Sequence, residues 1–126
     1  MPAKTESVTA QVKELLDQYN KDFAALAQKA SKEAADETAR DIRENASAMF
    51  GNGRYAKGWR ATRQEGGWIV HNATDYQLTH LLENGHVIRN KYGEYGRAPA
   101  YKHIGPAEQR GIVRFEELIN EGIEEI

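Results

Sequence analysis

Residues 12–50 read VKELLDQYNKDFAALAQKASKEAADETARDIRENASAMF, and this stretch decides the fold. Large apolar side chains recur along its first half in alternating steps of four and three, which is the spacing of one helical face. They are Val12, Leu16, Tyr19, Phe23, Leu26 and Ala30. The face continues in steps of four with smaller side chains, at Ala34, Thr38, Ile42 and Ala46. Because no glycine or proline occurs between residues 3 and 50, nothing ends the helix early.

The predicted helix is too long for the domain that it belongs to. At about 1.5 Å per residue, a helix of about 38 residues extends roughly 57 Å, more than the diameter of a compact domain of this size. Part of it must therefore project or lie on another subunit. We expect the alanine-rich half, residues 34–48, to pack closely on a neighbour or stay partly exposed. Residues 1–50 then form one part of a single domain, and residues 51–126 form its body.

The helix is expected to stop at Gly51-Asn52-Gly53, beyond which the apolar period changes to two, as in a half-buried strand. One face of this strand carries Tyr55, Trp59 and Ala61, and the other carries Arg60 and Thr62. A turn at Glu65-Gly66-Gly67 returns the chain as a second strand over residues 68–71. The pattern predicts an antiparallel hairpin.

A short helix is predicted next, because Thr74-Asp75-Tyr76-Gln77 matches a capping box. Its apolar face consists of Leu78, Leu81 and Leu82. Gly85 stands where a left-handed residue ends a helix. Val87 and Ile88 begin a further strand, and residues 89–98 are rich in glycine and polar residues, which favours a loop.

The last element starts at Gly105-Pro106, with proline in the first helical turn, where its missing N–H costs nothing. Apolar residues then repeat at helical spacing, at Ile112, Phe115, Ile119, Ile123 and Ile126. Gly111 and Gly122 each weaken this helix by up to about 1 kcal/mol relative to alanine, so it needs tertiary packing. The expected fold class is α+β: a long N-terminal helix, a small antiparallel sheet built on a hairpin, a short central helix and a C-terminal helix.

Composition limits the functional classes. The 126 residues fit one domain, and 40% hydrophobic residues build a modest core. The chain has no cysteine, which excludes disulfides and thiolate sites, and its net charge of -2 recruits neither nucleic acid nor membrane. No signal peptide or membrane span is predicted. The charge is uneven, because residues 1–50, 51–105 and 106–126 carry -2, +4 and -4, which suits head-to-tail contacts between identical subunits as well as it suits unrelated solvated faces.

Catalytic and metal sites find little support. His80 and Glu83 lie three apart on one helical face, with His86 and His103 further on, but no firm third ligand is defined and the pattern is not HExxH. We expect these histidines to bond backbone instead. Asp75 serves a helix N-terminus, and no hydrolase, phosphate-loop or dinucleotide motif is present. We therefore predict no catalytic residue, no metal, no cofactor and no enzyme.

The alternative function is a small nucleic-acid-binding protein that uses the basic middle segment. Four cations are interleaved there with Tyr55 and Trp59, as single-strand binding requires; they are Arg54, Lys57, Arg60 and Arg63. Residues 89–97 also mix cations with aromatics. Against this prediction, Lys57 and Trp59 share the strand face expected to meet the core.

Several motifs give the chain a resemblance to a known family. They are Lys57-Gly58-Trp59, the block from Asn72 to His86 (NATDYQLTHLLENGH) and the stretch from His103 to Ala107 (HIGPA). Over roughly residues 8 to 124 the chain resembles the head–tail connection proteins of long-tailed bacteriophages, known as neck or tail-completion proteins. The family often has proline directly before the histidine of the last motif, where this chain has Lys102 and where Pro99 lies four residues before His103.

The resemblance implies a structural virion protein without catalytic residues, which forms a homo-oligomeric ring, expected to be a hexamer, between head and tail. It implies other neck and tail proteins as partners, non-specific contact with DNA in the channel, assembly in the host cytoplasm and no membrane. It fits a tail terminator and an adjacent neck protein equally. The motif positions that it carries over are Trp59, Asp75, Tyr76, Leu82, Glu83, Gly85, His86, His103 and Pro106. The residues expected to contact subunits or partners are Val12, Leu16, Tyr19, Phe23, Leu26, Arg89, Tyr92, Tyr95 and Arg97.

Overall fold

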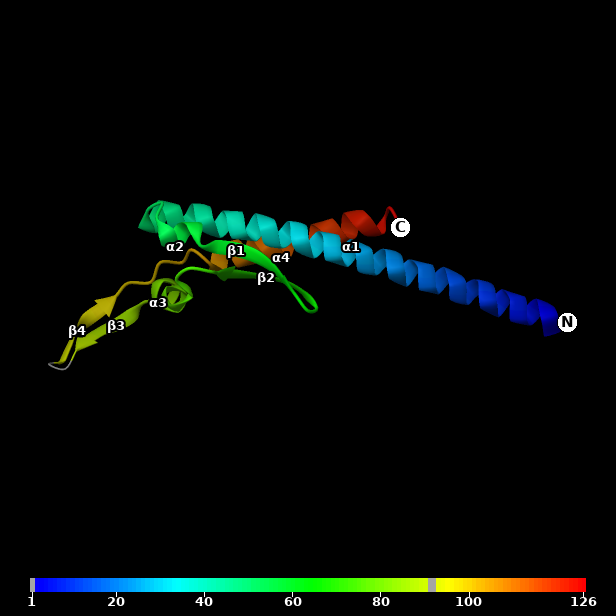
Figure 1. Ribbon diagram of the computed structural model, residues 1–126, viewed down its shortest axis with the longest axis horizontal. Coiled ribbons are helices and arrows are strands. Elements are labelled where there is room, and N and C mark those ends of the chain that lie inside the picture. Colours follow the sequence, from blue (N-terminus) through cyan, green and yellow to red (C-terminus); the bar gives the residue numbers. More distant parts are fainter. Residues whose placement is uncertain (1, 91–92) are drawn as a thin grey trace.

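The computed structural model describes the backbone of residues 2–90 and 93–126 and the side chains of residues 7–85 and 97–126 (Figure 1). Its elements, in chain order, are α1 (Pro2–Phe50), α2 (Arg54–Lys57), β1 (Trp59–Gln64), β2 (Gly67–Asn72), the 3-10 turn η1 (Tyr76–Leu78), α3 (Thr79–Asn84), β3 (His86–Asn90), β4 (Gly93–Ala98) and α4 (Gly105–Ile123). The predicted α+β fold class is confirmed.

Helix α1 is a single element of 49 residues, which corresponds to about 74 Å. The helix ends where predicted, at Gly51. Gly51 has a φ of 89°, a conformation that favours glycine, and its amide donates to the carbonyl of Ser47 at 3.0 Å. Figure 1 shows its N-terminal part extending far beyond the rest of the molecule. All residues from 7 to 25 are exposed, and we call residues 10 to 25 the free half of α1.

The core is built on the other half of α1. Its buried residues are Ala30, Ala34, Ala35, Ala39, Ile42 and Ala46 of α1, together with Ala56, Trp59 and Ala107. The expectation that residues 34–48 would pack on a neighbour or stay partly exposed is therefore wrong for their apolar face. Alanine side chains are small, so the β1–β2 hairpin and α4 come close to the helix axis and bury this face within the same chain.

Helix α4 runs antiparallel to α1, because Gly111 lies beside Thr38 and Gly122 lies beside Leu26. A Cβ atom at Gly111 would stand 2.3 Å from Thr38 Oγ1, and one at Gly122 would stand 2.1 Å from Leu26 Cδ1. The two glycines, which weaken an isolated helix, thus allow the two helices to approach each other closely.

Ion pairs border the same α1–α4 interface. The guanidinium of Arg110 bonds both carboxylate oxygens of Asp41, at 2.6 and 2.8 Å. Arg114 bonds Glu37 at 3.0 Å. These exposed contacts fix the alignment of the helices more than they add stability.

The first hairpin is confirmed, with Trp59 opposite Asn72 and Gln64 opposite Gly67. Tyr55 was expected on its strand, but Tyr55 and Lys57 belong to the helical turn α2 instead. This turn places the Tyr55 ring against Trp59, with ring centroids 6.0 Å apart.

A second hairpin replaces the loop predicted over residues 89–98. Strands β3 and β4 pair antiparallel, with His86 opposite Ala98 and Asn90 opposite Gly93, and the register shifts between Ile88 and Arg89. The start of a strand at Val87 and Ile88 is confirmed. The prediction for the rest was wrong because residues 89–98 show no regular apolar alternation in sequence, and because glycine suits the turn of the hairpin, where Gly93 has a φ of 138°.

The approach to α3 also differs from the prediction. The Thr74 hydroxyl donates to Arg54 O and to Asn72 Oδ1, both at 3.1 Å, and no side chain of the expected capping box caps η1 or α3. Gly85 does end α3 with a positive φ, of 74°, but its ψ of 173° places it in a region that only glycine occupies, outside the left-handed helical region.

Candidate functional site

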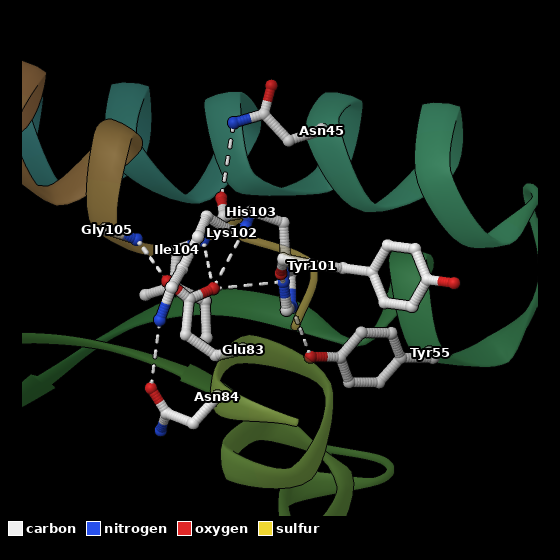
Figure 2. Close-up of polar contacts among 9 residues, drawn as sticks. All are labelled: Asn45, Tyr55, Glu83, Asn84, Tyr101, Lys102, His103, Ile104 and Gly105. Atoms are coloured by element: carbon white, nitrogen blue, oxygen red, sulfur yellow. Dashed lines mark hydrogen bonds and ion pairs between the residues drawn. The ribbon is translucent and has the colours of Figure 1, made fainter. Parts of the chain in front are cut away.

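Glu83, the next-to-last residue of α3, accepts three backbone hydrogen bonds at the start of α4. Its Oε1 accepts from the amides of His103 and Ile104 at 2.9 and 2.8 Å, and its Oε2 accepts from the amide of Gly105 at 3.0 Å (Figure 2). The first amides of a helix have no partners within the helix and lie at its positive end. A carboxylate held there therefore supplies both the missing acceptors and the favourable charge.

His103 is fully buried beside this carboxylate. Its Nδ1 lies 2.8 Å from Tyr101 O and 3.1 Å from Glu83 Oε1, and its Nε2 lies 2.6 Å from the Tyr55 hydroxyl. Both neighbours of Nδ1 are acceptors, so Nδ1 carries a hydrogen and the Tyr55 hydroxyl can donate to Nε2. The His103 carbonyl in turn accepts from Asn45 Nδ2 at 3.2 Å. We call Glu83, His103, Tyr55 and Asn45 the Glu83–His103 cluster.

The electrostatics of the cluster follow from these bonds. Burial by itself raises the pKa of Glu83, but the amide bonds from Ile104, Gly105 and His103, with the charge interaction with His103, outweigh it and lower the pKa below its ordinary value. Burial, followed by the negative charge of Glu83, raises the pKa of Tyr55 to about 12. Glu83 is thus an anion and Tyr55 a neutral phenol at neutral pH.

The Glu83–His103 cluster joins four helices, because Asn45, Tyr55 and Glu83 come from α1, α2 and α3 (Figure 2). All three converge on His103 and the residues after it, where α4 begins. A carboxylate that is ionised and already accepts three amides is a poor proton carrier at neutral pH. The Phe50 ring closes over His103 edge to face, with centroids 5.0 Å apart. We assign the cluster a structural role, as a clamp that fixes the chain before α4.

The other motif residues shape the same region. Tyr101 N donates to Leu82 O at 2.7 Å, and Pro106 lies in the first turn of α4. A Cβ at Gly85 would stand 2.6 Å from Ala98 O. Trp59 is buried, whereas Tyr76 is exposed. The side chain of His86 lies outside the described residues.

Asn72 is a buried residue whose role the sequence analysis missed. Its Oδ1 accepts from the amides of Thr74 and Asp75 at 3.1 and 2.7 Å, and its Nδ2 donates to Tyr55 O at 2.8 Å. The signal was an asparagine two and three residues before the amides that it bonds, which is the spacing of an Asx turn. Asp75 itself forms an ion pair with Arg54, at 3.3 Å.

The predicted absence of a metal site stays a prediction. Within residues 7–85 and 97–126 no three histidine, aspartate or glutamate side chains are grouped so that they could hold a metal ion. His80 is exposed, and both oxygens of Glu83 are bonded to backbone amides. In the described part of the chain, no helix has the length and apolar character needed to cross a membrane.

Two of the aromatic residues on which the nucleic-acid alternative depends are held within the fold. The Trp59 ring is buried and the Tyr55 hydroxyl is bonded to His103, so neither ring offers a free face to a base. The guanidinium of Arg54 bonds Thr74 O at 3.0 Å, and that of Arg60 bonds the carbonyls of Lys57 and Trp59. Several of the expected basic and aromatic contacts are thus part of the fold.

The expected contact residues of α1 form an exposed apolar stripe on the free half. The exposed fractions are 49% for Val12, 58% for Leu16, 45% for Tyr19 and 38% for Phe23. Leu26, at the end of the stripe, is half-buried beside Gly122. Arg97 is exposed, whereas the side chains of Arg89, Tyr92 and Tyr95 lie outside the described residues.

No protein family, curated protein or solved structure matches the chain.

Proposed function

We propose that the chain is a structural virion protein of a long-tailed bacteriophage, which forms a homo-oligomeric ring that joins tail to head. The family motifs that suggest this role include Glu83 and His103, and these two residues make the clamp at the start of α4. That coincidence supports the proposal because a motif with a purely structural task is what a non-enzymatic building block needs.

One observation carries the proposal: the apolar stripe on the free half of α1. Val12, Leu16, Tyr19 and Phe23 are between 38% and 58% exposed, so nothing in the described part of the chain covers this apolar stripe. Exposed contiguous apolar surface of this kind marks an interaction site. An assembly protein fits this feature better than a small enzyme or a nucleic-acid-binding module.

The proposal is tested by light scattering of the purified protein over a concentration series, with and without isolated tails of the phage that encodes it. A discrete ring, or a smaller species that becomes a ring on tails, supports it. A monomer that ignores tails overturns it and turns attention to DNA titrations of the basic segment. Glu14 lies on the helix face opposite the stripe. Glu14→Gln is therefore the matched control for substitutions within the stripe, and it should assemble like the wild type.

A further inference from the structure

A second unpartnered apolar surface lies on the body of the molecule. It is a groove of about 650 Å³ between α4 and the β1–β2 hairpin, with α1 as its third wall. Its apolar lining includes the exposed or partly exposed Trp68, Val70, Ile112 and Phe115, together with Ala35 and Trp59 of the buried core. Ile112 stays 46% exposed, so the groove is open to a partner in the isolated chain.

The stripe and the groove cannot meet within one chain. Both belong to α1: the stripe covers residues 12–23, and the helical wall of the groove covers residues 31–42. α1 is one helix through both segments, without glycine or proline between residues 3 and 50, so it has no point at which to fold back. The stripe can therefore fill this groove only in another copy of the chain.

The two surfaces match in length and shape. The stripe from Val12 to Phe23 extends about 17 Å along its axis, and the wall from Ser31 to Ile42 extends about 17 Å as well. The stripe is convex and has anchors at the steps of four and three that a helix uses to fill an apolar groove.

The charges beside the two surfaces are also complementary. At about 100° per residue, Lys13 and Asp22 lie on opposite flanks of the stripe. The α4 wall of the groove carries Glu108 and Glu116. Lys32 lies on the side of the hairpin, 5.8 Å from the ring centre of Trp68, where it also pairs with Asp36 at 3.4 Å. A helix seated with Lys13 towards α4 therefore has Asp22 towards Lys32.

The surface area is sufficient for such contacts. The chain exposes 9114 Å², whereas a compact monomer of its mass exposes roughly 6,800 Å². The excess of roughly 2,300 Å² exceeds the roughly 1,600 Å² that a ring subunit buries when each of two standard interfaces takes about 800 Å² from it.

We propose that the free half of α1 of one copy lies in the groove of a second copy, with Val12, Leu16, Tyr19 and Phe23 against the apolar walls. The contact is heterologous, since stripe and groove are different surfaces, and repetition of such a contact closes a ring. The inference rests on the proposed function for the place of this ring in a virion, but the contact itself involves only this chain.

Two variants test the contact in solution. Leu16→Asp damages the stripe and Ile112→Glu damages the groove, and both positions are exposed, so the monomer fold should persist by circular dichroism. At a concentration where the wild type is assembled, each variant alone should have the mass of a monomer. A 1:1 mixture should give a dimer, because each variant supplies the surface that the other lacks.

Disulfide trapping adds a positional test, since the chain has no cysteine of its own. A Leu16→Cys chain mixed with a tagged Ile112→Cys chain should form the mixed disulfide, and Glu14→Cys should not. The contact is overturned if Ile112→Glu assembles like the wild type, if the two variants stay monomeric when mixed, or if the wild type itself never assembles. The assay needs no tails, so its failure is separate from a failure to join tails.

Discussion

The carboxylate of Glu83 accepts hydrogen bonds from three backbone amides at the start of α4. The side chain of Glu83 is only 13% exposed. Glu83→Gln keeps the size of the side chain but removes the charge and turns an N–H group towards one of these donors. We expect the free energy of unfolding at pH 7 to fall by about 1–3 kcal/mol. Urea titration measures it, and Asn84→Ala, which removes only an exposed bond to Lys102, should change it by less than about 0.5 kcal/mol.

The same residue predicts a pH dependence. Because the folded protein lowers the pKa of Glu83 from 4.5, the charged form contributes stability that is present above pH 4.5 and is lost as the pH falls through the folded pKa. The difference in unfolding free energy between wild type and Glu83→Gln should therefore shrink as the pH falls below 4.5. A constant difference from pH 7 to pH 3 would contradict the assignment of the clamp.

Gly85 combines a backbone conformation closed to other residues with a close approach to Ala98 O. Gly85→Ala should lower the free energy of unfolding by roughly 2–4 kcal/mol, since it adds both backbone strain and a clash with a backbone atom. Gly53→Ala is the matched control, because Gly53 has a φ of -97° and no atom within 4 Å of the added Cβ. If Gly85→Ala and Gly53→Ala lowered the free energy of unfolding equally in chemical denaturation, the end of α3 would not depend on the conformation of Gly85.

At the scale of elements, the α1–α4 interface depends on Gly111. Alanine there improves helix propensity by up to about 1 kcal/mol, but its Cβ meets Thr38 Oγ1, which is fixed by a bond to Ala34 O at 2.7 Å. Overpacking of this kind costs about 1–3 kcal/mol, so we expect net destabilisation.

A double-mutant cycle checks that prediction. Thr38→Ala removes the atoms that the new Cβ would meet, so Gly111→Ala should be neutral or stabilising in that background. If Gly111→Ala lowered the free energy of unfolding equally in the wild type and in Thr38→Ala, the contact with Thr38 would not be the reason that position 111 requires glycine.

Most elements followed from the sequence because their signals are local. The uninterrupted helical stripe, the turn at Glu65–Gly67 and Pro106 each act within a few residues, and each lies where predicted. The core did not follow, because Ala46 becomes buried only when residues that are separated from it in sequence, among them Trp59 and Ala107, pack around it. Small apolar residues such as alanine indicate a core only when the elements that pack on them are known.

The Glu83–His103 cluster was open to prediction only in part. The resemblance marked Glu83, Gly85 and His103 as motif positions, but their contacts join residues 20 to 58 positions apart. Tyr55 was placed on a strand, and Asn45 had no signal at all, since one polar residue on a long helix resembles any other. Side-chain bonds between distant segments depend on tertiary structure that no local pattern encodes.

At the scale of the molecule, the body should not depend on the free half of α1. Removal of residues 2–21 deletes a segment whose described side chains, those of residues 7–21, are all exposed. The truncated chain should therefore unfold within about 1 kcal/mol of the Leu16→Asp variant, which serves as the full-length reference that is expected to be monomeric. Chemical denaturation of both proteins compares them. A loss of more than about 3 kcal/mol would mean that the free half stabilises its own body.

The continuity of α1 gives the molecule a mechanical property. Residues 26–50 are clamped by the body, and residues 7–25 form a stiff extension of about 28 Å, with no joint between the two parts. A tilt of the body by about 5° therefore displaces the tip by about 2.5 Å, roughly half a helical turn. In the proposed ring, levers of this kind would convert small tilts of the subunits into a change of the bore, while every hydrogen bond inside each subunit stays in place.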